Sequence, residues 1–181
     1  MPKLIDQAKN KILDSAERIL REEGYRDLTI RKVAADCSIA IGTIYNYFPN
    51  KKDLVDSILR REWERLLVEI EKLVAENHNP VAAILLINDT AFDYLNDYHV
   101  AIPDFSDNIK HQREMYRTRE AMIRGISYCI GKVFEKTGYQ EDPEFIRILS
   151  TSLLNSVYDK ETHHENMRIL LERVYGNQRI I

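Results

Sequence analysis

The sequence predicts an all-α protein made of two parts. Proline and glycine are scarce, at 5 and 6 of 181 residues, and four of the prolines separate periodic stretches of the chain: Pro49, Pro80, Pro103 and Pro143. Within those stretches apolar residues recur three and four positions apart, which is the spacing of one helix face. Hydrophobic residues make up 44% of the chain, enough to build a core.

The first elements expected are a helix over residues 6–23 and a shorter one after Thr29. Gly24 suits the C-terminal cap of the first helix. The Thr29 hydroxyl can accept an amide hydrogen bond in the first turn of the second helix. Apolar residues of that second helix fall on one face: Ile30, Val33, Ala34 and Cys37.

A third helix follows a short turn at residues 38–40. Ile44 and Phe48 give it a narrow buried stripe, and Pro49 ends it because proline disfavours helical geometry in the preceding residue. The polar side chains between them point elsewhere. Two helices joined by a turn of this length form a helix-turn-helix, whose second helix enters the major groove of DNA.

The rest of the chain predicts longer helices. Asn50 and Asp53 can cap a long fourth helix, a pairing similar to a capping box. Further helices are expected over residues 80–97, 108–136, 142–158 and 162–175, with a bend at 100–106. We therefore expect a three-helix, helix-turn-helix DNA-binding domain at 1–52 and a helical ligand-binding and dimerisation domain at 53–181.

Residues 33–51, VAADCSIAIGTIYNYFPNK, resemble the TetR/AcrR family of transcriptional regulators. The resemblance extends from about residue 5 to about residue 59, and beyond that it is only architectural. Six residues sit in register with the family pattern: Gly42, Thr43, Tyr45, Tyr47, Phe48 and Lys51.

The resemblance implies two sets of DNA contacts. Chemistry agrees, since hydroxyl groups and lysine are ordinary phosphate partners and asparagine suits adenine. Glycine near the start of a helix costs about 1 kcal/mol, which makes sense where the backbone must approach DNA closely. The implied phosphate contacts are Thr29, Arg31, Tyr47 and Lys51, and the implied groove residues are Ile41, Gly42, Thr43, Tyr45 and Asn46.

Three residues depart from the family pattern. Ser38 stands where a turn glycine is usual, and a positive φ there would cost serine about 1 kcal/mol. Ala40 stands where a serine usually caps the recognition helix. Ile41 replaces a residue that is often polar; it cannot hydrogen-bond a base edge but can pack on a thymine methyl group.

Charge is unevenly distributed. The net charge of −3 by itself argues against nucleic-acid binding. Residues 1–52, however, hold 10 Lys and Arg against 7 Asp and Glu, whereas residues 53–181 hold 16 against 22. The basic excess therefore lies with the helix-turn-helix, as a phosphate-facing surface requires.

The two cysteines, Cys37 and Cys129, do not make a disulfide framework, which favours a reducing compartment. Core packing explains Cys37 better than a redox switch does. No apolar run reaches the roughly 20 residues of a membrane span, and the N-terminus lacks the apolar segment of a signal peptide. We expect a cytoplasmic protein with no membrane partner.

The second part carries aromatic and methionine residues that can line an adaptable apolar site. Core packing is the alternative for each one taken singly. Asn88 interrupts an otherwise apolar helix and offers that site a polar contact. The candidate pocket residues are Trp63, Asn88, Phe92, Tyr98, Phe105, Met115 and Met122.

The last two helices carry more apolar surface than one packed side needs, which favours a homodimer interface. The alternative is that both faces are buried within one subunit. The candidate interface residues are Ile146, Leu149, Ser150, Leu153, Leu154, Val157, Met167, Leu170, Leu171 and Val174.

No catalytic constellation or phosphate-binding loop stands out, so we expect no enzyme activity and no cofactor. His163 and His164 are neighbours, and side chains of adjacent helical residues point about 100° apart. They make a poor joint metal site without further ligands, so no metal is expected.

The function that the resemblance implies is a repressor that binds a pseudopalindromic DNA operator as a homodimer. A small apolar or amphipathic effector in the second part would release it. One alternative is an architectural or cell-division factor that keeps the DNA-binding domain and is controlled by protein partners. The other is a carrier of apolar ligands, or an enzyme, with a vestigial head.

Overall fold

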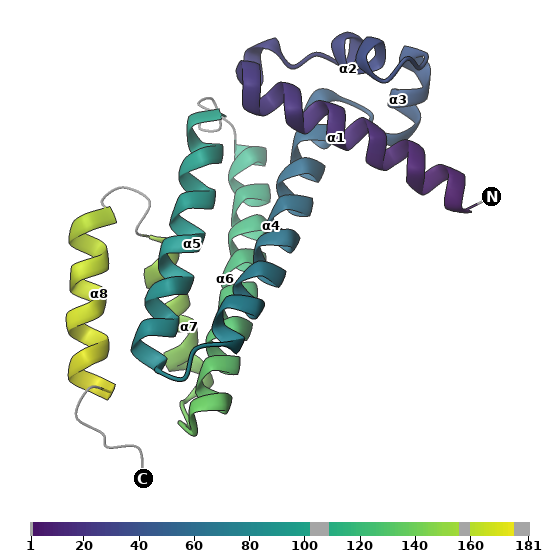
Figure 1. Cartoon of the computed structure of the whole chain (residues 1–181). Coiled ribbons are helices and arrows are strands. Elements are labelled where there is room, and N and C mark those ends of the chain that lie inside the picture. The colour runs from purple at the N-terminus through teal and green to yellow at the C-terminus, as the bar shows by residue number, and fades with distance from the viewer. Residues whose placement is uncertain (1, 102–108, 156–159, 176–181) are drawn as a thin grey trace. The chain divides into compact units, whose positions relative to one another are not determined.

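The computed structural model describes residues 2–101, 109–155 and 160–175. These residues form eight helices and no strand, as the sequence predicts (Figure 1). The helices are α1 (Pro2–Asp27), α2 (Ile30–Asp36), α3 (Ile41–Tyr47), α4 (Lys51–Ala75), α5 (Pro80–Ala101), α6 (Ile109–Thr137), α7 (Pro143–Leu154) and α8 (Lys160–Tyr175).

The described residues divide into two compact units after Trp63. The first unit contains the residues up to Trp63 and a short stretch that begins at Tyr98; Glu64–Asp97 and most later residues form the second. The division lies further along the chain than the boundary at residues 52 and 53 expected from the sequence. The first turns of α4 belong to the first unit because they bury Leu54, Val55 and Ile58.

The first unit is a small helical domain with a shared apolar core. Helix α1 packs against α2, and α2 packs against α3. Its innermost side chains come from all four helices and from the link before α2: Ile12, Ala16, Ile19, Leu20, Leu28, Val33, Ile44, Phe48, Leu54 and Ile58. This core fixes α3 by its inner stripe alone, which leaves the opposite face of α3 uncovered.

Both caps predicted in this unit are confirmed. The Thr29 hydroxyl accepts a hydrogen bond from the Lys32 amide at 3.2 Å and so begins α2. Asn50 Oδ1 accepts from the Asp53 amide at 2.9 Å, and the Asp53 carboxylate accepts from Asn50 Nδ2 at 3.0 Å. Ala40 begins α3 with no side-chain cap, as its side chain requires.

The turn between α2 and α3 places a non-glycine residue in the left-handed region. Ser38 has φ 54°, so this position does adopt the positive φ that a turn glycine would accommodate without strain. Gly24 has φ 85° and interrupts α1 near its end, at the position expected for the C-terminal cap. A Cβ atom disfavours this region, so Ser38 holds the turn at an energetic cost.

We expect Ser38→Gly to stabilise the protein by about 1 kcal/mol because it removes this backbone strain. Thermal unfolding of the two proteins measures the difference. Ser57→Gly, in the interior of α4, is the control and should lower stability, since glycine is unfavourable there. A lower stability for Ser38→Gly would contradict the strain argument.

In the second unit, α6 packs against α7, and a polar contact crosses this packing. The Ser127 hydroxyl donates to Ser150 Oγ at 2.8 Å. The end of α8 is held by Tyr175, whose hydroxyl donates to Glu141 at 2.8 Å and whose ring meets the Tyr139 ring edge-on at 5.0 Å. Burial, then the Glu141 carboxylate, raises the pKa of Tyr175 well above its usual value.

Several helix ends differ from the sequence prediction. Helix α5 continues to Ala101 rather than ending at residue 97, and α8 begins at Lys160 rather than at residue 162. The bend predicted at 100–106 therefore starts inside α5, and the remainder of it lies outside the described residues. Within the described ranges, no helix is both long and apolar enough to cross a membrane.

Candidate nucleic-acid interface

Helix α3 divides cleanly into a buried stripe and an exposed face. Ile44 and Phe48 are buried, at 0% and 2% exposure. Of the predicted groove residues, Ile41, Gly42, Tyr45 and Asn46 are exposed and Thr43 is half-buried, as is the predicted phosphate contact Tyr47. Side chains available for DNA thus gather on one short helix that is anchored from the opposite side.

The backbone of this helix is open to a close approach at Gly42. A Cβ atom placed on Gly42 would meet no heavy atom within 4 Å, so internal packing does not require glycine here. Its φ is also not in the left-handed region. The glycine therefore leaves the backbone of α3 uncovered at this position.

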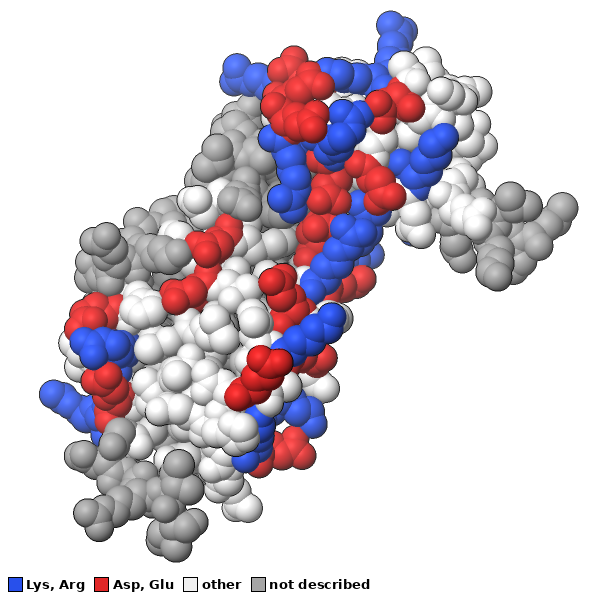
Figure 2. All heavy atoms as spheres, in the orientation of Figure 1, with Lys and Arg blue, Asp and Glu red and all other residues white. Residues whose placement is uncertain are grey.

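The first turn of α2 adds an exposed cation and a hydroxyl. Thr29 and Arg31 are exposed, and in the described part of the chain Arg31 makes no ion pair. Other basic residues of this unit are engaged: Arg18 contacts Asp36 at 2.5 Å, and Lys32 pairs with Glu23. Figure 2 shows charges of both signs interspersed on the face that it presents.

Lys51 lies in a different setting from Arg31. It is half-buried, and its ammonium donates to the Tyr25 carbonyl and sits 3.9 Å from the centre of the Tyr25 ring. Burial lowers the pKa of Lys51, and the charge of Asp27 opposes that change. An ammonium has three N–H donors, so those not used by Tyr25 remain for an anion outside the chain.

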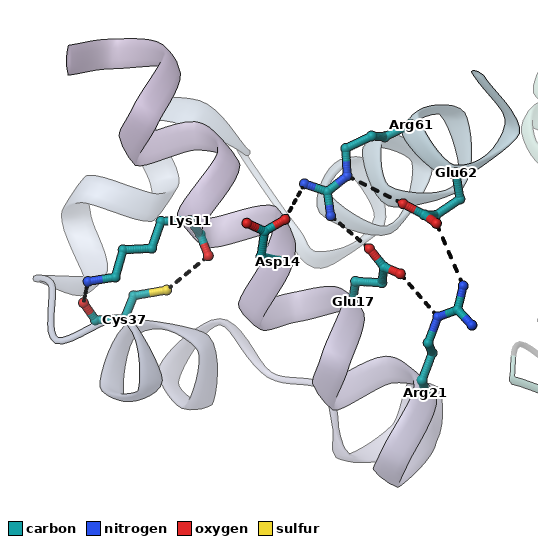
Figure 3. Close-up of polar contacts among 7 residues, drawn as sticks. All are labelled: Lys11, Asp14, Glu17, Arg21, Cys37, Arg61 and Glu62. Atoms are coloured by element: carbon teal, nitrogen blue, oxygen red, sulfur yellow. Dashed lines mark hydrogen bonds and ion pairs between the residues drawn. The ribbon is translucent and has the colours of Figure 1, made fainter. Parts of the chain in front are cut away.

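A cluster of charged residues joins α1 to α4 within the first unit (Figure 3). Arg61 contacts Asp14 at 2.7 Å, Glu17 at 2.8 Å and Glu62 at 3.6 Å. Arg21 contacts Glu17 at 3.0 Å and Glu62 at 3.6 Å. The contacts of Arg61 with Asp14 and Glu17 join residues more than 40 positions apart in the sequence, so no local pattern indicated them.

The same cluster sets the charge state of Glu17. Burial by itself raises the pKa of this carboxyl, but hydrogen bonds with Arg61 and Glu62 and the charges of Arg21 and Arg61 outweigh it. The pKa therefore lies below its usual value. Glu17 is held as a carboxylate between two guanidinium groups.

A second contact in Figure 3 ties α1 to the start of the turn. Lys11 Nζ donates to the Cys37 carbonyl at 2.9 Å, and the Cys37 thiol donates back to the Lys11 carbonyl at 3.5 Å. A cation at the end of a helix is favoured by the helix dipole, so Lys11 stabilises the end of α2. Helix α1 thereby fixes the position of the turn between α2 and α3.

The predicted pocket residues are only partly described. Trp63 is buried in the first unit. In the second unit, Asn88 is buried, and Phe92 and Met122 are half-buried. Phe105, and the side chains of Tyr98 and Met115, lie outside the described residues.

Asn88 is the notable member of this set. It is 1% exposed, and its Oδ1 is buried with no hydrogen-bond partner among the described residues. Its neighbours on the same face of α5, Ile84, Ile87 and Ala91, are all buried. A buried acceptor without a partner is costly, so such an atom calls for a water or a ligand group.

Most residues predicted for the dimer interface are buried within the subunit, and a few are exposed. The periodic apolar stripes of α7 and α8 face the core of the second unit. Ile146 is half-buried, and Val157 lies outside the described residues. Six residues are buried within the subunit and present no surface to a second copy: Leu149, Ser150, Leu153, Leu154, Met167 and Leu171.

A second apolar stripe on α8 remains exposed. Leu170 and Val174 lie one turn apart, at 45% and 39% exposure, and Ile169 lies beside them at 45%. Ile148 on α7 is exposed at 58%. Leu170 and Val174 belong to the predicted interface. Ile169 does not belong to it, although it is equally exposed.

His164 pairs with an acidic residue rather than with its neighbour His163. His164 Nδ1 lies 2.8 Å from Asp89 Oδ1, a contact between α8 and α5. Both side chains are about one third exposed, at 32% and 37%. The side chain of His163 lies outside the described residues.

Comparison with known proteins bears on this helix-turn-helix directly. The family described as bacterial regulatory proteins of the tetR family matches residues 12–58, which cover most of the first unit. The helix-turn-helix of this chain therefore matches the TetR family. The matched segment contains α2, α3 and the first turns of α4, the elements whose geometry is given above.

Two curated relatives are repressor or regulator proteins by name. The chain is 28% identical over 103 residues to the HTH-type transcriptional repressor KstR2 of Rhodococcus jostii, covering 57% of this chain and 50% of that protein. It is 29% identical over 93 residues to the fatty acid metabolism regulator protein of Bacillus subtilis, covering 51% and 48%. The chain spans about half the length of these relatives.

A solved structure shares the fold over nearly the whole chain. The transcriptional regulator FadR from Bacillus subtilis, in complex with stearoyl-CoA, aligns with a TM-score of 0.56 at 18% identity. The alignment covers 93% of this chain and 98% of that one. At this identity the likeness extends to the fold of both units and no further.

Proposed function

We propose that this TetR-family chain is a transcriptional repressor that binds a pseudopalindromic DNA operator as a homodimer and is released by a small apolar or amphipathic effector. The observation that supports the proposal is the exposed face of α3, whose opposite side is anchored by buried residues. This helix lies in the segment that matches the family. The names of the relatives support repression over activation. They also favour a regulator over an enzyme.

In the proposed complex, α3 lies in the major groove. Ile41, Gly42, Thr43, Tyr45 and Asn46 approach base edges, with Asn46 as the hydrogen-bonding reader. Phosphate contacts come from the flanking residues Thr29, Arg31, Tyr47 and Lys51. The open backbone at Gly42 supports a close approach of the helix to DNA.

Binding-site selection tests this function. The full chain is incubated with a library of random double-stranded DNA, and bound sequences are enriched and read. The expected result is one enriched sequence with two inverted half-sites, because a two-fold symmetric dimer reads both strands alike. Enrichment of no sequence, or binding that does not weaken as salt rises, would contradict sequence-specific DNA binding.

We expect Arg31→Ala and Lys51→Ala both to lower the salt slope of operator binding by about one unit, since each removes one phosphate contact. Lys51→Ala should also lower the stability of the fold, because Lys51 donates a hydrogen bond to the Tyr25 carbonyl. Arg31→Ala should leave stability unchanged, because Arg31 is exposed. Fluorescence anisotropy at several salt concentrations gives the slope, and thermal unfolding gives the stability. An unchanged slope for Lys51→Ala would assign that residue to the fold alone.

The second unit is the proposed effector domain. Its apolar helix α5 carries the buried, unpartnered Oδ1 of Asn88, which accepts a hydrogen bond from a donor group of the effector in this proposal. The stearoyl-CoA bound to FadR motivates a long-chain acyl thioester as the first probe. Addition of stearoyl-CoA should release the operator, and unchanged DNA binding would argue against this effector class.

We expect Asn88→Leu to raise the stability of the effector-free protein by about 1 kcal/mol, since it removes a buried acceptor that has no partner. The same substitution should weaken release by stearoyl-CoA. Thermal unfolding and the DNA-release assay measure the two effects. A loss of stability would mean that Asn88 serves the fold instead.

Release follows from a population shift in this proposal. The effector binds the DNA-incompetent arrangement of the dimer better and so favours it. Helix α4 begins in the first unit and continues into the second, so it provides the covalent route between them. The exposed stripe of α8, formed by Leu170 and Val174, is the proposed dimer surface.

A further inference from the structure

Among the described side chains of the first unit, two large apolar ones are exposed, and both lie on α3. Ile41 is 40% exposed and Tyr45 is 51% exposed, while the other large apolar side chains described in this unit are less exposed. Because the two are four residues apart, they share one face of the helix. Neither is required by the core, which is filled from the other side of α3.

The two residues beside Ile41 carry no polar side chain. Ala40 makes no side-chain cap, and Gly42 has no side chain at all. Thr43, the next residue with a polar side chain, is half-buried, so Ile41 is the exposed side chain at the start of the helix. In the major groove the one apolar feature of a base is the C5 methyl group of thymine.

We propose that Ile41 selects thymine at one position of each operator half-site by packing on its C5 methyl group. The inference rests on the proposed DNA-binding function and adds a residue that sets its specificity. Ile41 supplies an exposed side chain of matching polarity, and Gly42 lets the helix come close enough for contact. Hydrogen-bond readout is then left to residues further along α3, such as Asn46.

Uracil substitution isolates this contact, because uracil differs from thymine only by that methyl group. Each thymine of the enriched half-site is replaced in turn by uracil, and the affinity of the full chain is measured. At one position the replacement should weaken binding about three- to five-fold, as loss of one buried methyl group predicts. Ile41→Ala should bind the two DNAs equally at that position.

Asn46→Ala is the matched control on the same exposed helix. It should weaken binding overall yet keep the sensitivity to uracil at the Ile41 position. Alanine is a better helix former than isoleucine, so Ile41→Ala should fold as well as the parent. Folding is checked by thermal unfolding.

Two outcomes would overturn the inference, and they are distinguishable. In the first outcome, an operator is enriched, but Ile41→Ala loses as much affinity as the parent at every thymine replaced by uracil. That result would overturn the role of Ile41 and leave the proposed DNA binding intact. A selection that enriches no sequence would overturn the proposed function and this inference together.

Discussion

Leu170→Glu is expected to convert the proposed dimer into a folded monomer and to weaken operator binding by roughly 10²- to 10⁴-fold. Leu170 is exposed on α8, so a charge there leaves the core of the subunit intact but opposes burial against a second copy. Affinity falls because a monomer loses the second half-site, whose binding within a dimer is intramolecular. Sedimentation gives the oligomeric state, and anisotropy gives the affinity.

Val68→Glu is the matched control, since Val68 on α4 is also an exposed apolar residue, at 52%. It should remain dimeric and bind the operator normally. If Leu170→Glu sedimented as an intact dimer, the interface would lie elsewhere. Leu153→Glu would be a poor test, because Leu153 is buried within the subunit and a charge there is expected to destabilise the fold.

Arg61→Met should destabilise the first unit by roughly 2 kcal/mol at neutral pH. The loss leaves Glu17 and Glu62 with less compensation, and their side chains are only 15% and 10% exposed. The figure lies below the 3–5 kcal/mol of a fully buried pair because solvent still reaches the cluster. Arg60→Met, at an exposed neighbouring position, should have little effect.

The pH dependence of this difference gives a second readout. The folded pKa of Glu17 is lowered, so its stabilising contribution is present above the unfolded pKa and is lost as pH falls through the folded pKa. Without Arg61, this pKa loses the largest of the causes that lower it. The stability gap between parent and variant should therefore narrow in acid, and a gap independent of pH would contradict the role of Glu17.

The first unit could be predicted from the sequence in detail because its signals are local. Caps such as Thr29 and Asn50 act within three residues, and the strain at Ser38 follows from the residue type at a turn. The alternation of buried Ile44 with exposed Tyr45 follows from helical periodicity. Each of these needs no knowledge of the rest of the fold.

The partners that bury α7 and α8, and the contacts between distant helices, could not be predicted. They depend on which surface covers each helix, and the sequence pattern of one helix does not show that. Periodicity indicates that Leu149 and Leu171 lie on buried stripes, but it does not say whether the same subunit or a second copy buries them. The contacts of Arg61 with Asp14 and Glu17 are long-range, so no spacing announces them. The same holds for the extent to which α4 joins the first unit.

The two cysteines give each unit a separate chemical reporter. Cys37 lies in the first unit and Cys129 in the second, and both thiols are free and buried. Burial, with a smaller effect of Glu71, raises the pKa of Cys129 to about 11, so little reactive thiolate exists at neutral pH. Alkylation of either thiol must therefore wait for its own unit to open. Labelling rates at the two positions, resolved by mass, would register the opening of one unit independently of the other in the unmodified protein.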